Sequence, residues 1–416
     1  MLRNYLLTAY KVFMRRKLFT AINLMCIVLT LVVLMVITTL LENAFFPTSG
    51  PEAKSGRFLQ IMTMRSRSPN NESIRNSPLG YKLIEKYLKP LPGLEAVAAV
   101  TQPRAVSVYQ GGRVTELQMR RADADYWKVL DFTVLAGRLP TLEDEQRGRF
   151  VAVINRSSGT RLFGGLPQGQ LGRKVSVSGQ TMEIIGVVED TMHINAYADI
   201  WAPITTYPSS DYRRLLSGDF VALLLAKKAS DLPQLRAEIK AIAASVEFDD
   251  PAEWERAFFW ADSKLDLFAR MTVGGLETEN SGAATLLAII VAAMLLFMLL
   301  PALNLINLNT GRILERSSEI GVRKAFGATS AQLVGQLIVE NVLLCLAGGV
   351  IGVICAQGAL IWLEGSGLIP YLKVSMNFAV LGYGLLITLV FGLLSGVLPA
   401  WKMSRLDPVH ALKGTV

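Results

Sequence analysis

An apolar run near the N-terminus constrains the fold of this chain more than any other feature. Residues 18–41 contain no Asp, Glu, Lys or Arg. At about 1.5 Å per residue, a helix of this length covers about 36 Å, which is enough to cross a bilayer. A cleaved signal peptide also follows basic residues, but its apolar core is shorter and leads to a small-residue cleavage site. This run is longer and ends in the sequence ENAFF, so we expect a retained membrane anchor.

Three further apolar runs and the overall composition indicate a protein that crosses the membrane several times. The chain has 416 residues, of which 51% are hydrophobic, and its mean hydropathy of +0.37 is high for a soluble protein. A long polar region separates the first run from the second, and no stretch within it could span a membrane. We therefore predict a membrane protein with four transmembrane α-helices and a large extracytoplasmic α+β domain inserted between helices 1 and 2.

The distribution of basic residues sets the predicted topology. Lys and Arg gather next to the apolar runs, so the net charge of +8 does not indicate nucleic-acid binding. By the positive-inside rule, both termini are cytoplasmic and the polar domain is outside. The predicted segments are an amphipathic N-terminal helix (1–17), transmembrane helix 1 (18–42), the α+β domain (43–281), transmembrane helix 2 (282–309), a cytoplasmic surface-helix region (310–330), transmembrane helix 3 (331–363), an outer turn (364–375), transmembrane helix 4 (376–400) and a cytoplasmic tail (401–416).

The polar region contains both helical and strand patterns. We predict helices at residues 79–88 and 232–246. Short apolar runs predict strands at 58–64, 96–101, 150–154, 174–177, 182–188 and 220–225. The sequence VSVSGQTMEIIGVV predicts a β-hairpin with its turn at Ser178, Gly179 and Gln180. We expect the amphipathic stretch 265–279 to continue into the next span as a helical stalk, although Gly274 and Gly275 disfavour an unbroken helix.

Few residues carry reactive or metal-binding chemistry. Cys26, Cys345 and Cys355 all lie in apolar runs and have no metal-ligand spacing. The two histidines, His193 and His410, form no H-E-x-x-H motif, and the sequence contains neither G-x-S-x-G nor a Gly-Lys dipeptide, so it has no Walker A loop. We therefore nominate no catalytic, metal-binding or substrate-binding residue, and expect neither enzyme activity nor a bound cofactor on this chain.

A charged segment joins the second and third predicted spans. It begins with ERSSEIGVRK at residues 315–324 and breaks at Gly327, after which Thr329 or Ser330 can cap a new helix. We expect a short amphipathic helix at about 316–326 on the membrane surface. Its apolar residues are too few for a core of its own. It either docks on another protein or is only a charged loop that fixes the topology, and physical grounds alone leave both readings open.

The pattern E-R-x-x-E-I-G-V-R-K-A-x-G-A in this segment resembles the signature of the FtsX-like permeases, the MacB group of ABC transporters. The matching residues are Glu315, Arg316, Glu319, Ile320, Gly321, Arg323, Lys324, Gly327 and Ala328. The resemblance implies that the segment is a cytoplasmic coupling helix, which sits in a cleft of an ATPase subunit. On this reading the polar contacts come from Arg316, Glu319, Arg323 and Lys324, and the apolar anchors are Ile320 and Phe326.

Two other regions resemble the same family. Residues 136–188 are similar to the MacB-type periplasmic domain through the sequences AGRLP and VAVIN and the predicted hairpin. The tail LPAWKMSRLDPVHALK resembles the terminal motif of these permeases, although Met403 stands where the family usually has a small residue.

The third apolar run contains a strip of small residues, Gly348, Gly352 and Ala356, which lets two helices approach closely. The strip is either a dimer face or a packing face for a neighbouring span of the same chain. Glu340 also lies in this run, where an ionisable group is a functional candidate by default. Because it lies near the cytoplasmic end, we favour a structural role, at the interface or paired with a basic residue of the coupling segment.

The resemblance implies the permease subunit of an ABC transporter in the bacterial inner membrane. Two ATPase subunits would bind ATP and Mg²⁺ and grip the coupling helices of a dimer, formed by this chain alone or with a similar permease. Hydrolysis would then drive export by mechanotransmission to the periplasmic domain. The alternative is an FtsX-like regulatory subunit that controls an extracytoplasmic partner such as a cell-wall hydrolase; a scaffold without an ATPase is a third reading. A periplasmic adaptor remains an open partner, and the substrate is not identified.

Overall fold

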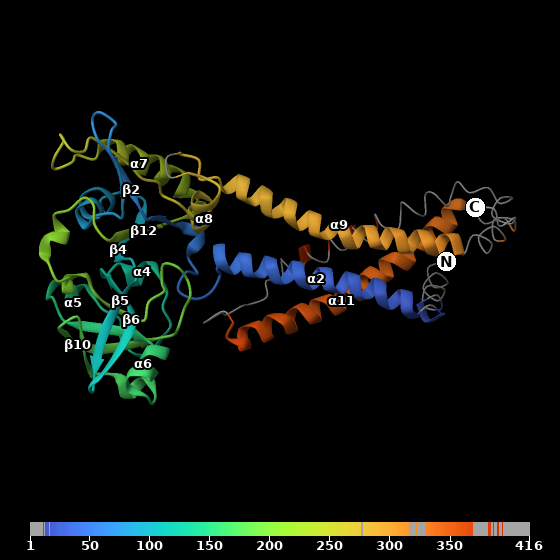
Figure 1. Cartoon of the computed structure of the whole chain (residues 1–416), viewed down its shortest axis with the longest axis horizontal. Helices are drawn as coiled ribbons and strands as arrows, with labels where there is room; N and C mark the ends of the chain where they lie inside the picture. Colours follow the sequence, from blue (N-terminus) through green and yellow to red (C-terminus); the bar gives the residue numbers. More distant parts are fainter. Residues whose placement is uncertain are drawn as a thin grey trace. The chain divides into compact units, whose positions relative to one another are not determined.

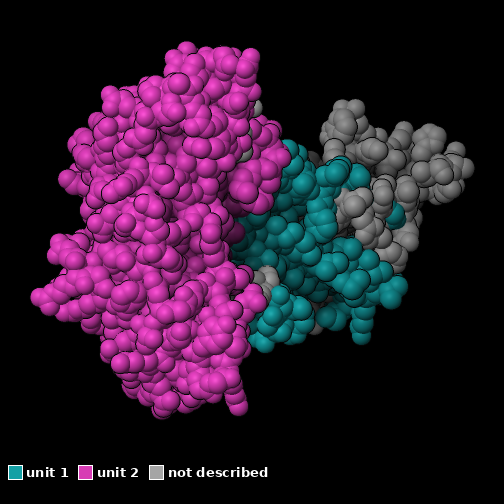
Figure 2. Space-filling model, turned by 60° about the vertical axis from the view of Figure 1, so that its left-hand side comes forward, with its two compact units in different colours: residues 1–41, 287–369, 373–416 teal, residues 42–286, 370–372 magenta. Residues whose placement is uncertain are grey.

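The computed structural model describes residues 17–275, 278–315 and 329–368, together with residues 11, 13–15, 322, 326, 382, 383, 386, 389, 390 and 393. The chain divides into two compact units, which Figure 2 colours separately. Within the described part, the α/β domain comprises residues 42–286, and the helical unit comprises the residues before 42 and from 287 onwards.

The α/β domain contains a ten-stranded mixed sheet and a smaller three-stranded sheet (Figure 1). The large sheet has the order β1-β12-β4-β6-β11-β8-β10-β9-β5, and β7 pairs with β10. Its strands are β1 (Phe58–Ile61), β4 (Leu94–Thr101), β5 (Arg104–Gln110), β6 (Arg113–Ala122), β7 (Val134–Gly137), β8 (Val151–Asn155), β9 (Lys174–Val177), β10 (Gln180–Val188), β11 (Ile200–Pro203) and β12 (Phe220–Ala226). The small sheet has the order β13-β2-β3, with β2 (Met64–Arg67), β3 (Ile74–Ser77) and β13 (Arg256–Phe258). The β8–β10 and β6–β11 pairings are parallel.

Part of the large sheet closes on itself. β5 pairs with β9 and also with β6, so the path β6-β11-β8-β10-β9-β5 returns to its first strand. Closure removes the free edge that β5 would otherwise expose. Alternate residues of these strands form one buried cluster, which includes Leu117, Ile154, Val177, Ile184 and Ile200.

β12 shows why the sheet needs cover on both of its faces. All seven of its residues are buried, and none of them is polar. Phe220, Ala222 and Leu224 belong to one hydrophobic cluster, whereas Val221 and Leu223 belong to another. Successive side chains of a strand point to opposite faces, so each face of β12 packs against a separate core.

The helices of the domain are short, apart from α7. They are α3 (Tyr81–Leu83), which continues as a π-helical turn (Ile84–Leu88), α4 (Tyr126–Val129), α5 (Leu142–Gln146), α6 (Arg156–Phe163), α7 (Leu232–Ser245) and α8 (Lys264–Thr272). Single 3₁₀ turns lie at Ser55–Arg57, Pro167–Gln170, Ile204–Thr206, Ser210–Arg213 and Ala229–Asp231. On α7, Leu235, Ile239 and Ala243 are buried, at the spacing of one face of a helix.

The structure confirms both predicted helices of the polar region and all six predicted strand regions, with small shifts at their ends. It divides the region 58–64 between β1 and β2. The hairpin is confirmed as β9–β10, but Gln180 is paired with Val177 rather than in the turn. The turn therefore has two residues, Ser178 and Gly179, which both have positive φ as a type I′ turn requires.

The predicted continuous stalk at 265–279 is wrong. α8 ends at Thr272, and the next helix begins only at Ala283. Gly274 lies so close to the returning chain that a Cβ there would be 2.3 Å from the carbonyl oxygen of Ser281, and Gly282 has a φ of +79°. These two glycines allow the chain to fold back on itself between the two helices.

Three long helices, α2 (Lys17–Phe45), α9 (Ala283–Glu315) and α11 (Ser330–Ser366), are mostly apolar (Figure 1). In the described residues, the segments Thr20–Phe45 and Val334–Ser366 are long and apolar enough to cross a membrane, and a shorter apolar segment, Ala283–Leu299, opens α9. α11 extends beyond the predicted end of the third span and stops at Gly367, which is left-handed. The predicted helix at 1–17, the predicted fourth span at 376–400 and the tail fall almost entirely outside the described residues.

Candidate functional site

The predicted coupling segment lies between α9 and α11. Glu315 is the last residue of α9, and Thr329 precedes the first residue of α11. Phe326 is described, whereas the other predicted coupling residues lie outside the described residues: Arg316, Glu319, Ile320, Gly321, Arg323, Lys324 and Gly327.

Phe326 is hydrogen-bonded to Val322, the other described residue between Glu315 and Thr329. Its backbone N–H donates to the carbonyl oxygen of Val322 over 3.0 Å, which is the spacing of an α-helix. Phe326 is 88% exposed and Val322 is 44% exposed. Residues four apart share one face of a helix, so both apolar side chains point outwards on the same side. A large exposed aromatic side chain of this kind is typical of an anchor for another protein.

The start of α11 shows how the coupling segment ends. Thr329 caps the helix, because its hydroxyl accepts from the backbone N–H of Gln332 while the side chain of Gln332 accepts from the backbone N–H of Thr329. This confirms Thr329, rather than Ser330, as the cap. Further along, the amide of Gln336 donates to Glu340 over 3.0 Å, and both side chains are buried.

The small-residue strip of α11 packs against α2 of the same chain. A Cβ added at Gly348 would lie 2.6 Å from Ile27, and one added at Gly352 would lie 3.0 Å from Leu31. Ala356, one helical turn further on, has no exposed surface. Of the two readings of this strip, the structure therefore shows packing on a neighbouring helix of the same chain.

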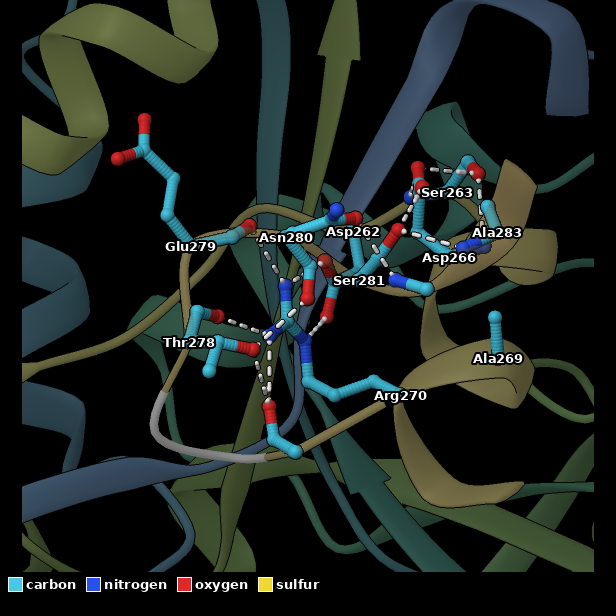
Figure 3. Close-up of polar contacts among 12 residues, drawn as sticks. Asp262, Ser263, Asp266, Ala269, Arg270, Thr278, Glu279, Asn280, Ser281 and Ala283 are labelled. Atoms are coloured by element: carbon cyan, nitrogen blue, oxygen red, sulfur yellow. Dashed lines mark hydrogen bonds and ion pairs between the residues drawn. The ribbon is translucent and has the colours of Figure 1, made fainter. Parts of the chain in front are cut away.

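A second site, absent from the sequence-based predictions, lies in the α/β domain where the chain turns into α9 (Figure 3). We call it the clamp and define it as Asp262, Ser263, Asp266, Arg270 and Ser281. α8 starts with a capping box, in which the Ser263 hydroxyl accepts from the Asp266 backbone N–H and the Asp266 carboxylate accepts from the Ser263 backbone N–H. This box fixes the orientation of α8, and Arg270 follows one turn later on the same face.

Arg270 is the centre of the clamp. Its guanidinium binds the Asp262 carboxylate in a two-pronged contact, with distances of 2.8 Å from Nε and 3.0 Å from Nη2. It also donates to the carbonyl oxygens of Gly275 and Thr278, which belong to the loop between α8 and α9. The backbone of Asp262 exchanges two hydrogen bonds with Gln60 of β1. Arg270 therefore links the loop to the main sheet through a single side chain, which is only 4% exposed.

Asp266 ties the first residues of α9 to α8. Its carboxylate accepts from the Ser281 hydroxyl over 2.7 Å, and from Arg236 of α7 over 2.5 Å. The Ser281 hydroxyl in turn accepts from the backbone N–H of Ala283, the first residue of α9. Although burial opposes ionisation, the hydrogen bonds from Ser281 and Ser263 lower the pKa of Asp266. By contrast, burial raises the pKa of Asp262 in spite of Arg270.

A buried ion pair provides a second link, between the segment that follows α2 and the start of α8. Lys264 Nζ lies 2.5 Å from Glu52 Oε2, and the two side chains are 7% and 0% exposed. The other carboxylate oxygen of Glu52 accepts from the backbone N–H of Asn195. His193 lies 3.9 Å from Glu52, and burial lowers its pKa, so it is mainly neutral at pH 7. The pair thus joins the segment that follows α2 to the first turn of α8.

The comparison with known families accounts for both parts of the chain. The profile of the MacB-like periplasmic core domain matches residues 20–242, which is more than half of the chain, and that of the FtsX-like permease C-terminal region matches residues 291–408. This chain belongs to the MacB/FtsX-like family of ABC transporter permeases. The permease thus has a MacB-like domain between its N-terminal helix and its C-terminal region, as the resemblance implied.

Relatives of the permease differ in length. It is 26% identical to the uncharacterized ABC transporter permease YknZ of Bacillus subtilis, over 79% of this chain and 77% of YknZ. It is also 26% identical to the permease YvrN of the same organism, over 89% of this chain and 85% of YvrN. The macrolide export ATP-binding/permease protein MacB of Hahella chejuensis is 24% identical over 69% of this chain, but the match covers only 41% of MacB. The solved extracellular domain of YknZ aligns with 48% of the permease and 98% of that domain, at a TM-score of 0.37 and 18% identity.

The sequence did contain a signal for the clamp. Ser263 and Asp266 form an S-x-x-D pattern immediately before a helical stretch, which is a form of the capping-box signature. Arg270 follows Asp266 by four residues, a spacing that suggests a pair along one helix face. The actual partners of Arg270, which are Asp262 and the loop carbonyls, depend on how the chain folds back after Thr272.

Proposed function

We propose that the permease is the membrane subunit of an ABC transporter that docks a separate ATPase on its coupling segment. The chain crosses the inner membrane four times, with both termini in the cytoplasm and the α/β domain in the periplasm. Two copies, or one copy and a similar permease, form the transport unit. ATP hydrolysis on the partner subunits moves α9 and α11, and this movement reaches the α/β domain and drives export by mechanotransmission. A periplasmic adaptor is a further partner of this assembly.

The observation that carries the docking step is the exposure of Phe326. Large aromatic residues are the side chains that most often anchor protein–protein interfaces. Phe326 and Val322 present an apolar surface in a segment that otherwise carries many charges, including Arg323 and Lys324. This combination suits a cleft with an apolar pocket and an acidic or polar rim.

The clamp supports the transmission step. A movement of α9 can act on the α/β domain only if the loop between α8 and α9 is stiff. Arg270 and Asp266 bind that loop at Gly275, Thr278 and Ser281, and the backbone of Asp262 connects the same cluster to β1. Buried charged hydrogen bonds of this kind hold one geometry, because breaking them leaves unpaired charge in the interior.

The relatives support a separate ATPase subunit. YknZ and YvrN, of which this chain covers most of the length, are named permeases. The match to MacB, whose name includes ATP binding, covers only 41% of that protein. We infer that ATP and Mg²⁺ are bound by the partner, and that the permease itself is not an enzyme.

Charge reversal of the coupling segment tests the docking step. In the double variant Arg323→Glu/Lys324→Glu, vanadate-sensitive ATPase activity that co-purifies with the tagged permease from native membranes should fall at least about tenfold. Phe326→Ser should give a smaller loss, because it removes an anchor without adding repulsion. The matched control is Lys227→Glu/Lys228→Glu, which reverses an exposed neighbouring pair in the α/β domain. Unchanged ATPase co-purification in the coupling variant would show that the docking assignment is wrong.

Labelling tests the proposed topology independently of the ATPase. Single cysteines at Ser317 or Ser318, in a variant lacking Cys26, Cys345 and Cys355, should react with a membrane-impermeant maleimide only after the cells are opened. A cysteine at Leu142, in α5 of the α/β domain, should react in spheroplasts of intact inner membrane. Labelling of 317 or 318 from the outside would place the coupling segment on the wrong face of the membrane.

A further inference from the structure

α8 is an amphipathic helix whose charged side faces inwards. The side chains of its charged residues Lys264, Asp266 and Arg270 are 7%, 13% and 3% exposed. Its outward face carries Phe268, 46% exposed, and Met271, 72% exposed. The apolar residues Leu265, Leu267 and Ala269 of α8 are buried together with the charged ones, whereas Phe268 and Met271 face outwards.

The clamp determines which side of α8 faces the domain. Because Arg270 and Asp266 must bind Asp262, Ser281 and the loop carbonyls, one side of α8 is committed to polar partners inside the domain. Phe268 and Met271 lie three positions apart and therefore share the other side. Val273, directly after α8, is 40% exposed and is a third exposed apolar side chain of this region. We call Phe268, Met271 and Val273 the apolar edge.

The apolar edge begins at the end of a membrane-length helix. The ring of Phe268 lies 5.3 Å from the ring of Phe45, measured between centroids, and Phe45 is the last residue of α2. The segment Thr20–Phe45 has a mean hydropathy of 2.9 and is long enough to cross a bilayer. Phe46, the next residue, is 52% exposed. If α2 crosses the membrane, Phe45 marks the depth at which the chain leaves it, and Phe268 lies at the same depth.

We propose that the apolar edge of α8 lies in the outer interface of the lipid bilayer, with Phe45 and Phe46 beside it. This inference depends on the part of the proposed function in which α2 spans the membrane. Aromatic residues are favoured at the interface, where their rings sit at the level of the headgroups. A helix with one apolar face lies in this layer with that face turned towards the acyl chains. Contact with lipid explains why three apolar side chains face outwards next to a span.

A second copy of the chain is a less suitable occupant of the apolar edge. The edge is one face of a helix of nine residues. Stable protein–protein interfaces bury about 800 Å² on each partner, which is far more than one such face provides. The bilayer has no such minimum area, because the adjacent spans already hold the chain in place.

Lipid quenching tests the proposal on the full chain. Met271→Cys is introduced into a variant in which Cys26, Cys345 and Cys355 are replaced by Ala, and is labelled with bimane. The protein is placed in proteoliposomes that contain phospholipid with a nitroxide on the headgroup or on an upper acyl carbon. The fluorescence at position 271 should fall about two- to threefold more than at the control Leu142→Cys, which lies on α5. Figure 1 shows α5 on the side of the domain away from α8.

Reference positions in the long helices separate failure of this proposal from failure of the proposed function. Leu29→Cys in α2 and Ile354→Cys in α11, which are 61% and 66% exposed and lie near the middle of their helices, report whether these helices lie in the bilayer when the phospholipid carries its nitroxide deep on the acyl chain. If either is quenched while position 271 behaves as Leu142, the apolar edge is not at the membrane although the span is. If neither is quenched, the membrane crossing itself is wrong and this proposal fails with it. Quenching at 271 that depends on protein density rather than on spin-labelled lipid would also overturn it, since it would show that a second copy covers the edge.

Discussion

The capping boxes of α5 and α8 are of the same type, and they differ in how exposed the neighbouring arginine side chains are. At the clamp, Ser263 pairs with Asp266, and the neighbouring Arg270 has a side chain that is 3% exposed. At α5, Thr141 pairs with Asp144, whose carboxylate has no exposed surface. The second cluster is completed by Arg138 and Arg149, whose side chains are 47% and 39% exposed.

The difference lies in the cation rather than in the carboxylate. Water can solvate Arg138 and Arg149 if their contacts with Asp144 are lost, so the α5 cluster stabilises a local turn. Water cannot reach Arg270 without opening the domain, so its contacts must be kept as a set. The same short motif therefore caps a helix in both places. Only at the clamp is it also part of a buried cluster that binds the loop before α9.

Arg270→Met should produce the largest effect. It leaves the Asp262 carboxylate buried without its cation, and the carbonyl oxygens of Gly275 and Thr278 without a donor. Removing one partner of a buried ion pair costs about 3–5 kcal/mol, so the α/β domain should lose a large part of its stability. The measurement is the thermal midpoint of the purified permease in detergent, followed by circular dichroism.

Two further variants sharpen this comparison. Arg149→Met, at the exposed cluster, should cost about 1 kcal/mol or less, because Arg149 is itself partly solvated and Arg138 still pairs with Asp144. Adding Asp262→Asn to Arg270→Met should recover part of the loss, since it removes the unpaired charge. If Arg149→Met and Arg270→Met lowered the midpoint equally, the distinction between the clusters would not hold.

Lys264→Met should rank second. It leaves Glu52 buried without its ammonium partner, although the backbone N–H of Asn195 continues to donate to it. We expect a loss of about 3 kcal/mol, near the lower end for a broken buried pair. The double variant Lys264→Met/Glu52→Gln should be more stable than Lys264→Met alone. Equal stability of the single and double variants would show that an unpaired Glu52 is not the source of the loss.

Asp144→Asn tests the exposed cluster through its pH dependence. The Arg138 guanidinium, together with the hydrogen bonds from Thr141 and Arg149, holds the pKa of Asp144 well below its usual range. A lowered pKa in the folded state stabilises the protein above the ordinary pKa of about 4, and this contribution is lost as the pH falls towards the lowered value. The variant should be about 1–2 kcal/mol less stable at pH 7.

The same variant should also lose part of the acid sensitivity of the wild type. The difference in thermal midpoint between the two proteins should shrink between about pH 4 and pH 2, because protonated Asp144 resembles Asn. A difference that stayed constant over this range would mean that the negative charge of Asp144 does not contribute to stability.

The sequence was sufficient for elements whose signal is local. FVALLLA is a continuous apolar run, MEIIGVV is an apolar run that contains Glu183, and they form β12 and most of β10. The sequence also predicted a helix cap at Thr329 or Ser330 and a hairpin turn at residues 178–180, because the residues that make them are neighbours in the chain.

Elements that depend on distant partners were missed. β5 and β6 contain several polar and charged residues and were not among the predicted strands, yet they pair over seven positions and close part of the sheet. The partner of Arg270 could not be inferred either, because a buried guanidinium is unexpected in an amphipathic helix and its loop carbonyls come together only in the fold. A continuous stalk, as predicted, would contain no loop between α8 and α9.

The smallest effect is expected for an exposed ion pair beside the clamp. Lys240 of α7 lies 2.6 Å from Glu279 in the loop before α9, but the two side chains are 54% and 66% exposed. Exposed ion pairs contribute about 0.5 kcal/mol or less, so Lys240→Ala should leave the thermal midpoint within about 1–2 °C of the wild type. Glu279 belongs to the same loop that Arg270 binds. The variant therefore tests whether the loss of stability depends on contact with the loop or on burial of the cation. A large loss in Lys240→Ala would show that the loop is held by its surface contacts, and the contrast between the two capping boxes would then have another cause.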